Sequence, residues 1–172
     1  MESVAWEDKD HPEWSVQEFI RRLNEKERGR GYLYRLPTEV EWEYIPRGGA
    51  TSQKECAFDF YFDKPTNDLS SRQANFDGNH PHGGGAKGPY LERTSKVGSY
   101  KPNKLGVYDM HGNVWEWCED LSEPEASARV LRGGSWFHDG VHCRSAYRRR
   151  VGPAYRYRHD GFRLAIVPLE YK

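Results

Sequence analysis

The strongest constraint in this 172-residue sequence lies near its C-terminus, where two strand patterns enclose residues that follow no secondary-structure period. Residues 129–132 (RVLR) combine charged and apolar side chains, as a half-buried strand does, before a Gly-Gly pair. Residues 161–167 (GFRLAIV) predict a second strand with Phe162, Leu164 and Ile166 on one face. We therefore expect the chain between them to be a long connection held at both ends by strands.

This connecting segment, residues 137–160, has an unusual composition. It contains three His, three Tyr and six Arg, but no Lys, Glu, Gln, Met or Trp. Those five types make up 36 of the other 148 residues, so their absence by chance has a probability of roughly one in a thousand. None of the five is encoded by a codon that ends in a pyrimidine, whereas mutation of the adenines in AAC or AAT yields Tyr, His, Asp, Phe, Val, Arg and Gly. The alternative is an Arg-rich loop whose bias is accidental.

Composition also bounds the fold class. A chain of this length can form one domain with its own core, and its hydrophobic fraction is only 36% while aromatic residues reach 14%. We therefore expect a core of few, large side chains and more loop than regular structure. The 26 basic and 26 acidic residues balance, which argues against whole-chain attraction to nucleic acid or anionic membrane. No apolar run is long enough to span a membrane, and the first residues do not form a signal peptide.

Three short elements can be predicted in the N-terminal third. A capping-box pattern that begins at Ser15, followed by apolar residues at helical spacing, predicts a helix over residues 16–26. Residues 32–36 form a short strand pattern. A second capping box that begins at Thr38 predicts a helix that ends before Pro46.

Residues 47–103 show no sustained period and are rich in Gly, Pro, Asn, Asp and Ser, which predicts long, ordered loops. His80 and His82 flank a proline, and we interpret them as part of a solvated turn rather than a metal site. The glycine-rich residues 83–88 lack the spacing of a phosphate-binding loop. The three cysteines show no Cys-x-x-Cys spacing, which argues against a disulfide framework or a zinc ribbon.

A bent loop and a buried strand are predicted around residues 114–117 (VWEW), which follow a Gly-Asn pair suited to a left-handed turn. Asp109 and Glu116 flank this turn, with the backbone carbonyls of Gly112 and Val114 between them. Two carboxylates and carbonyls on a bent loop are ligands that calcium takes. In the alternative, both carboxylates accept hydrogen bonds from backbone amides and tryptophan N–H groups. A structural calcium ion is thus one of two interpretations, and no cofactor is required.

Four motifs, in this order, resemble the formylglycine-generating-enzyme (sulfatase-modifying factor) family. They are residues 34–44 (YRLPTEVEWEY) with 47–49 (RGG), 106–117 (GVYDMHGNVWEW), 131–136 (LRGGSW) and 161–164 (GFRL). The resemblance implies one α+β domain over residues 1–172 with a C-type-lectin-like fold, made of two helices, short antiparallel strands and many loops. It also implies that the family's N-terminal strand segment is missing or shortened here.

The enzymes of this family are copper-dependent oxidases with two cysteines shortly after the Gly-Gly-Ser motif. The corresponding region of this chain contains only Cys143, and a single thiol cannot form a two-thiolate copper(I) site. His138 and His142 are the other residues there that could ligate copper. The departure predicts a protein that is not an enzyme, and a copper oxidase is kept as an alternative.

A second branch that this chain resembles is the variable proteins of diversity-generating retroelements. In these proteins, adenine-directed mutagenesis rewrites ligand-contacting residues between an Arg-Gly-Gly-Ser-Trp and a Gly-Phe-Arg-Leu motif, here about residues 130–164. The resemblance implies a binding protein whose unknown ligand is a protein surface. The positions predicted to be diversified are Phe137, His138, Asp139, Val141, His142, Tyr147, Arg149, Tyr155, Tyr157, His159 and Asp160. The positions predicted to be fixed are Arg132, Gly133, Gly134, Ser135, Trp136, Arg144, Ser145, Ala146, Arg148, Gly161 and Phe162.

A scaffold that tolerates such replacement must draw its stability from elsewhere. We expect the core to be built on Trp42, Trp115, Trp117, Trp136, Phe162 and the two helices. We also expect Arg144 and Arg148 to pair with Glu116, Glu119 or Asp120, which would fix the loop backbone. Oligomeric state and compartment stay open, and both a cytoplasmic location and display through another component are compatible with the sequence.

Single-stranded nucleic-acid binding is the alternative from another class of function. Six arginines and two tyrosines form a locally basic, aromatic run in the connecting segment, a pattern typical of such binding. The neutral chain and the absence of lysine from the run make nucleic acid the less favoured partner.

Overall fold

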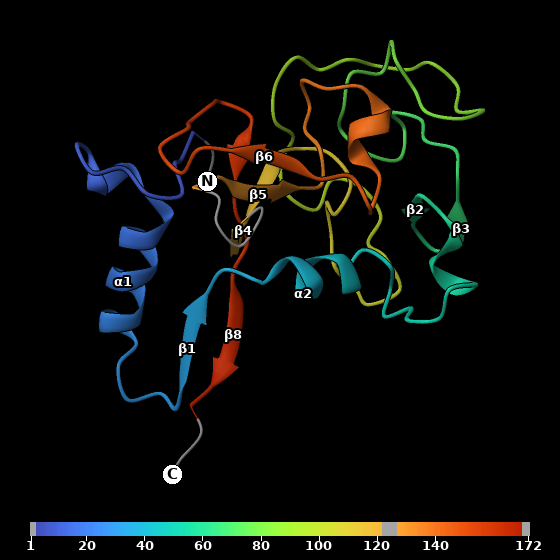
Figure 1. Cartoon of the computed structure of the whole chain (residues 1–172). Coiled ribbons are helices and arrows are strands. Elements are labelled where there is room, and N and C mark those ends of the chain that lie inside the picture. Colours follow the sequence, from blue (N-terminus) through green and yellow to red (C-terminus); the bar gives the residue numbers. More distant parts are fainter. Residues whose placement is uncertain (1–2, 122–126, 170–172) are drawn as a thin grey trace.

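The computed structural model describes residues 3–121 and 127–169, and regular structure is sparse in this part of the chain. The helices are α1 (Val16–Lys26) and α2 (Glu39–Tyr44), with 3-10 turns η1 (Pro12–Trp14), η2 (Glu55–Ala57) and η3 (Gly140–Cys143). The strands are β1 (Tyr32–Arg35), β2 (Phe60–Tyr61), β3 (Pro65–Thr66), β4 (Trp115–Leu121), β5 (Arg129–Arg132), β6 (Arg149–Val151), β7 (Asp160–Gly161) and β8 (Ala165–Pro168). The predicted α+β class with high loop content is confirmed (Figure 1).

A four-stranded sheet in the order β6-β5-β4-β7 lies at the centre of the molecule. Strand β4 pairs with β5 in antiparallel fashion and with β7 in parallel fashion, so the connecting segment leaves the sheet on one side of β4 and returns on the other. The prediction that strands hold both ends of this segment is confirmed. The sequence pattern missed β6, a strand within the segment that pairs with β5.

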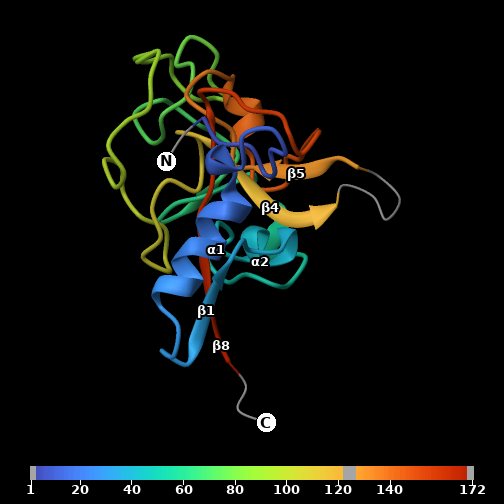
Figure 2. The ribbon, with the colours of Figure 1, turned by 90° about the vertical axis from the view of Figure 1, so that its left-hand side faces the viewer.

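The two predicted helices form where the capping residues place them. Helix α1 covers the predicted residues, and the Ser15 hydroxyl accepts a hydrogen bond from the Glu18 amide at 3.2 Å. Helix α2 begins with a complete capping box, in which the side chains of Thr38 and Glu41 accept from each other's backbone amides. Helix α1 lies beside β1 (Figures 1 and 2). The side chain of Asn24 on α1 forms two hydrogen bonds with the backbone amide and carbonyl of Tyr34 on β1.

The C-terminal strand pattern is only partly right. The chain leaves the central sheet after Gly161, and β8 pairs instead with β1 in a two-stranded ribbon. Phe162 and Leu164 lie half-buried against the core, but Ile166 is exposed. The single apolar face predicted for the three residues is therefore wrong, because the first two lie beside the central sheet and Ile166 lies on the ribbon.

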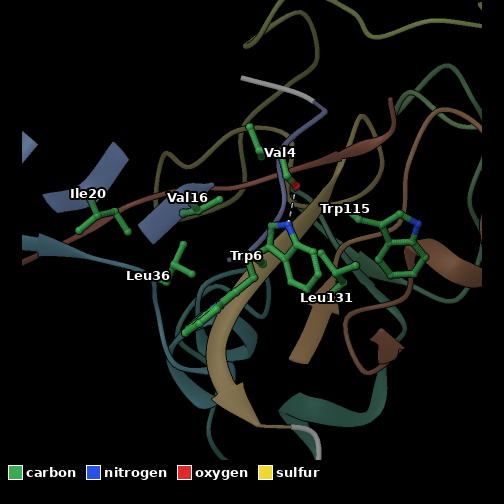
Figure 3. Close-up of a cluster of buried hydrophobic side chains, with 8 residues drawn as sticks. Val4, Trp6, Val16, Ile20, Leu36, Trp115 and Leu131 are labelled. Carbon is green, nitrogen blue, oxygen red and sulfur yellow. Dashed lines mark hydrogen bonds between the residues drawn. The ribbon is translucent and has the colours of Figure 1, made fainter. Parts of the chain in front are cut away.

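Tryptophans dominate the main core, as the composition predicts. Trp115 and Trp117 of β4 are fully buried and pack with Val16 and Ile20 of α1 and with Leu36. This cluster also contains Val4, Trp6 and Leu131 (Figure 3). Trp136 and Trp42 are buried as well, the latter in a second cluster with Cys118.

A fully buried arginine, Arg132, joins the sheet to α2 and to the connecting segment. Its guanidinium forms ion pairs with Glu39 and Glu43 on α2. The same group donates hydrogen bonds to the backbone carbonyls of Ser145 and Ala146. A charge in a dry interior is stable only when it is paired and hydrogen-bonded, and these contacts do this for the two terminal nitrogens, whereas Nε has no partner among the described residues.

Replacing Arg132 with alanine should destabilise the fold by about 3–5 kcal/mol, because two carboxylates would lose their buried partner. Urea denaturation followed by tryptophan fluorescence measures the change. The matched control is Arg22→Ala, which removes an exposed ion pair with Glu18 and should leave the midpoint unchanged. A small effect at Arg132 would show that the buried pairs are not essential to the fold.

Candidate functional site

The connecting segment covers the upper part of the molecule in Figure 1, where it is drawn in orange to red. Nine of the eleven predicted binding residues are at least partly exposed. Among the eleven, Phe137, Tyr155 and Tyr157 are exposed aromatic residues, with exposed fractions of 47%, 43% and 42%. His159 and Asp160 are buried. Most of the predicted positions thus offer side-chain area to a ligand.

Seven of the predicted residues carry rings, and all seven belong to one connected set of ring contacts. Neighbouring centroids along the set are 4.7 Å to 5.5 Å apart. We call this set the ring surface: Tyr155, Tyr157, His159, Phe137, His138, His142 and Tyr147. Because aromatic pairs favour stacked or edge-to-face contacts, the rings hold one another in a defined arrangement.

Trp115 lies beneath the ring surface. Its ring contacts His138 and Tyr147 at centroid distances of 5.5 Å and 5.9 Å. Its indole N–H points to His138 Nδ1 at 3.3 Å, and the Ser135 hydroxyl lies 2.8 Å from the same nitrogen. Because the indole N–H can only donate, Nδ1 is the acceptor, which places the proton of the neutral ring on Nε2. One core tryptophan thus orients a predicted binding residue.

Two predicted binding residues support the surface from below. Asp160 is fully buried on β7, and its carboxylate accepts hydrogen bonds from the Tyr157 amide and the Arg149 guanidinium at 3.1 Å and 3.2 Å. Arg149 is half-buried and also lies over the Trp115 ring at 5.6 Å. Asp160 therefore fixes the backbone and the guanidinium rather than facing a ligand.

The predicted fixed residues position the start of the segment. Gly133 and Gly134 both adopt positive φ, and a Cβ on Gly134 would lie 2.6 Å from the Cys143 sulfur. Only glycine fits such a close approach without strain. The backbone amide of Trp136 then donates to the carbonyl of Asn113 at 2.9 Å. This turn places Phe137 on the surface directly after the buried Trp136.

The predicted partners of Arg144 and Arg148 were wrong. Arg148 pairs with Glu39 at 2.5 Å, and Arg144 lies 3.8 Å from Asp59. The predicted acceptors are engaged elsewhere: Asp120 accepts from the backbone amide of Glu39 at 2.5 Å. Glu116 accepts a hydrogen bond from Trp42 and pairs with Arg163. Arg149 pairs with Asp160, so among the described residues Arg144, Arg148 and Arg149 of the run all lie beside carboxylates, which reduces its positive charge.

Asp139 and Val141 lie at the margin of the ring surface, at the beginning of η3 and within it. Asp139 is exposed and faces two residues that sequence reasoning assigned elsewhere, Asp77 and His80. The sequence predicts a solvated turn at His80 and no functional role for Asp77. The Asp-x-x-His spacing in residues 77–80 was the available signal, but no sequence pattern linked it to a residue 59 positions later.

The calcium ligands proposed from the sequence have other partners. The Glu116 carboxylate accepts from the Trp42 indole N–H at 2.6 Å and from Arg163 at 2.6 Å and 2.7 Å. Asp109 accepts from the Gly98 amide at 2.7 Å. The guanidinium of Arg163 thus supplies the positive charge beside Glu116. These contacts correspond to the alternative in which a backbone amide and a tryptophan N–H satisfy the carboxylates, with Arg163 as a further partner of Glu116.

The residues present also do not fit the copper site of the family's enzymes. Cys143 is fully buried against Phe60 and Phe76, and burial raises the pKa of its thiol. A thiolate is the form that binds copper(I), and this environment opposes it. Cys118 lies in a different core cluster, and both thiols are free.

A hollow of about 610 Å³ lies apart from the ring surface. Its lining includes Asp109, Val114, Glu116 and Arg163 but none of the eleven predicted binding residues. The candidate site is therefore an exposed aromatic face rather than an enclosed cavity, and such a face suits a large partner better than a small molecule.

Comparison with known proteins identifies the family. The sulfatase-modifying factor enzyme 1-like domain matches residues 1–167. The chain belongs to this family. It has the C-type-lectin-like fold that the four motifs implied.

Its relatives include enzymes, inactive proteins and a variable protein. A formylglycine-generating enzyme from Streptomyces coelicolor is 36% identical over 124 residues, which cover 63% of this chain and 38% of that protein. The inactive C-alpha-formylglycine-generating enzyme 2 of Mus musculus is 38% identical over 104 residues, 59% of this chain and 31% of that protein. The structure of Treponema denticola variable protein 1 matches with a TM-score of 0.59 and 29% identity, over 79% of this chain and 48% of that one.

The chain thus spans less than half the length of each of these relatives. Family membership alone does not decide between catalysis and binding, because enzymes and inactive proteins share the domain. Within residues 3–121 and 127–169, no helix is long and apolar enough to cross a membrane.

Truncation of the exposed tyrosines should leave the fold intact. Tyr155→Ala and Tyr157→Ala remove rings that are exposed and contact each other, so the urea midpoint should stay at the wild-type value. Trp115→Ala is the contrasting variant and should lower the free energy of unfolding by about 3–5 kcal/mol, because it leaves a cavity in the core beneath the ring surface. Unfolding of either tyrosine variant would place these rings in the core.

Acidification should destabilise the chain through His138. Burial, with smaller contributions from His159, Arg149 and His142, lowers the pKa of His138 from 6.5 to about 3. As pH falls, the unfolded state therefore takes up this proton first, so stability present above pH 6.5 is lost progressively from pH 6.5 towards pH 3.

Urea denaturation at pH 7 and pH 5 measures this loss. His138→Asn should lose about 1–2 kcal/mol less stability over this interval than the wild type. His111, whose pKa burial lowers to about 4, keeps part of the acid sensitivity in both proteins. The control His11→Asn changes an exposed histidine and should retain the wild-type pH dependence. An equal loss in His138→Asn and wild type would contradict the assignment.

Proposed function

We propose that this chain is a ligand-binding variable protein of a diversity-generating retroelement, and that the ring surface with Arg149 is its binding site. The observation that carries the proposal is a coincidence of two independent features. Seven of the eleven positions whose residue types fit mutated AAC or AAT codons form one connected set of rings, and six of these seven rings are at least partly exposed.

The chemistry of this face supports a protein ligand. Tyr and Arg provide large contact area and directional polar groups at modest entropic cost, and they dominate known binding hot spots. The likeness to Treponema denticola variable protein 1 supports the same function.

The proposal includes the absence of oxidase activity. The one cysteine near the Gly-Gly-Ser motif is buried as a thiol, and the site that a two-thiolate copper ion needs is not provided by the described residues. The inactive C-alpha-formylglycine-generating enzyme 2 of Mus musculus is a relative in which the domain lacks catalysis, which is consistent with this part of the proposal.

The DNA around the gene should contain the source of the diversity. We expect a near-copy of the segment that encodes residues 130–164, with AAC or AAT codons at the predicted diversified positions, beside a reverse-transcriptase gene. Sequencing of the flanking DNA tests this directly. A locus without either element would overturn the retroelement assignment.

The binding role can be tested separately with a display library. Diversification of Phe137, Asp139, Tyr155 and Tyr157 should yield folded binders to a probe protein such as lysozyme. A control library should diversify Val40, Val97, Leu105 and Ile166, which are more exposed than Phe137, Tyr155 and Tyr157 but lie outside the connecting segment, and should yield none. Equal enrichment from both libraries would show that the ring surface has no special role.

A further inference from the structure

A second chemical feature lies at the margin of the ring surface. A carboxylate oxygen of Asp77, a ring nitrogen of His80 and a carboxylate oxygen of Asp139 all lie within 4.8 Å of one another. His80 and Asp139 are exposed and Asp77 is half-buried, so an ion can reach all three from solvent. Among the described residues, this is the group of His, Cys, Asp and Glu side chains whose ligand atoms converge in this way.

The backbones that carry these side chains are bonded to each other. The Asp77 amide donates to the His138 carbonyl at 3.0 Å, and the Gly140 amide donates to the His80 carbonyl at 2.9 Å. These two bonds flank Asp139 in the sequence. A Cβ at Gly140 would lie 3.0 Å from the His82 amide nitrogen, so the two segments approach as closely as glycine allows. The three ligands are thus brought together by the fold, without help from an ion.

The Asp77 carboxylate is also oriented. Its Oδ1 atom accepts from the backbone and side-chain nitrogens of Asn79 at 3.0 Å and 2.9 Å. Hydrogen bonds of this kind hold metal-ligating carboxylates in position. Two carboxylates at this separation repel each other, and a divalent cation between them removes that repulsion.

We propose that Asp77, His80 and Asp139 bind a divalent transition-metal ion of the zinc type. Zinc takes one imidazole and two carboxylates readily, whereas calcium requires six to eight oxygen ligands. The ligand atoms around a tetrahedral zinc ion lie roughly 3.3 Å apart, so the three side chains must close on the ion. Rotation of the exposed His80 and Asp139 side chains provides this movement.

Three protein ligands leave the fourth position of a tetrahedral ion open. That position would face solvent beside the ring surface, where a carboxylate or imidazole of a bound protein can complete the coordination. This role rests on the proposed function, but metal binding itself does not. Two ligands belong to a loop outside the connecting segment and the third, Asp139, is a predicted diversified position, so sister proteins with another residue there would lack the site.

Isothermal titration calorimetry with zinc chloride at pH 7.5 tests the proposal on the whole chain. We expect one zinc ion per chain, with affinity weakened at least about tenfold in His80→Ala and in Asp139→Asn. Neither change should unfold the chain, because His80 is exposed and the Asp139 side chain makes no capping hydrogen bond. The matched controls His11→Ala and Asp63→Asn alter exposed residues outside the cluster and should bind zinc as the wild type does.

The outcomes are distinct from those of the binding test. Absence of zinc binding, or zinc binding that survives both cluster variants, overturns the metal site. Displacement of zinc by an equal concentration of calcium also overturns it. Stoichiometric zinc binding in a chain whose gene lacks a template repeat would sustain the site while the proposed function fails. A template repeat without zinc binding would do the reverse.

Discussion

The guanidinium of Arg132 connects the parts of this molecule that must stay constant to the part proposed to change. Its charge is neutralised by Glu39 and Glu43 of α2, and it lies over the Trp42 ring. Its contacts to the connecting segment are made to backbone carbonyls. Since every residue type offers a carbonyl, side chains in the segment can be exchanged without loss of these bonds.

The same arrangement recurs around the segment. The Ser145 amide donates to the Asp59 carbonyl at 2.8 Å, and the Trp115 amide donates to the His159 carbonyl at 2.8 Å. Backbone bonds also join Asp77 to His138 and His80 to Gly140. The long loops outside the sheet therefore have a mechanical role: they supply donors and acceptors at fixed points along the segment. These backbone bonds fix the path of the segment although it contains little regular structure.

The sequence correctly predicted the elements that depend on contacts between residues close together in the chain. Ser15 and Thr38 start their helices through contacts within one turn, and the aromatic fraction predicted a tryptophan core. The sequence did not predict side-chain partners that lie far apart in the chain. The partners of Arg148 and Glu116 depend on where α2 and Arg163 lie, and the meeting of Asp77 with Asp139 depends on how two distant loops cross. Ile166 follows the strand period, but the choice of β1 as partner strand exposed it.

The composition of the connecting segment has an energetic consequence beyond its origin. Of the five types it lacks, Lys, Glu, Gln and Met are long, flexible side chains whose immobilisation costs about 1.5–2 kcal/mol each in rotamer entropy. The types it contains are mostly rings and short side chains, and the rings already restrict one another through contacts such as that of Tyr157 with His159 at 5.2 Å. The six arginines of the segment carry the same cost, but none of them belongs to the ring surface, so the ring surface itself loses less rotamer entropy on binding than an average protein surface. A codon rule that excludes these four types would therefore favour stiff binding surfaces before any selection for a particular ligand.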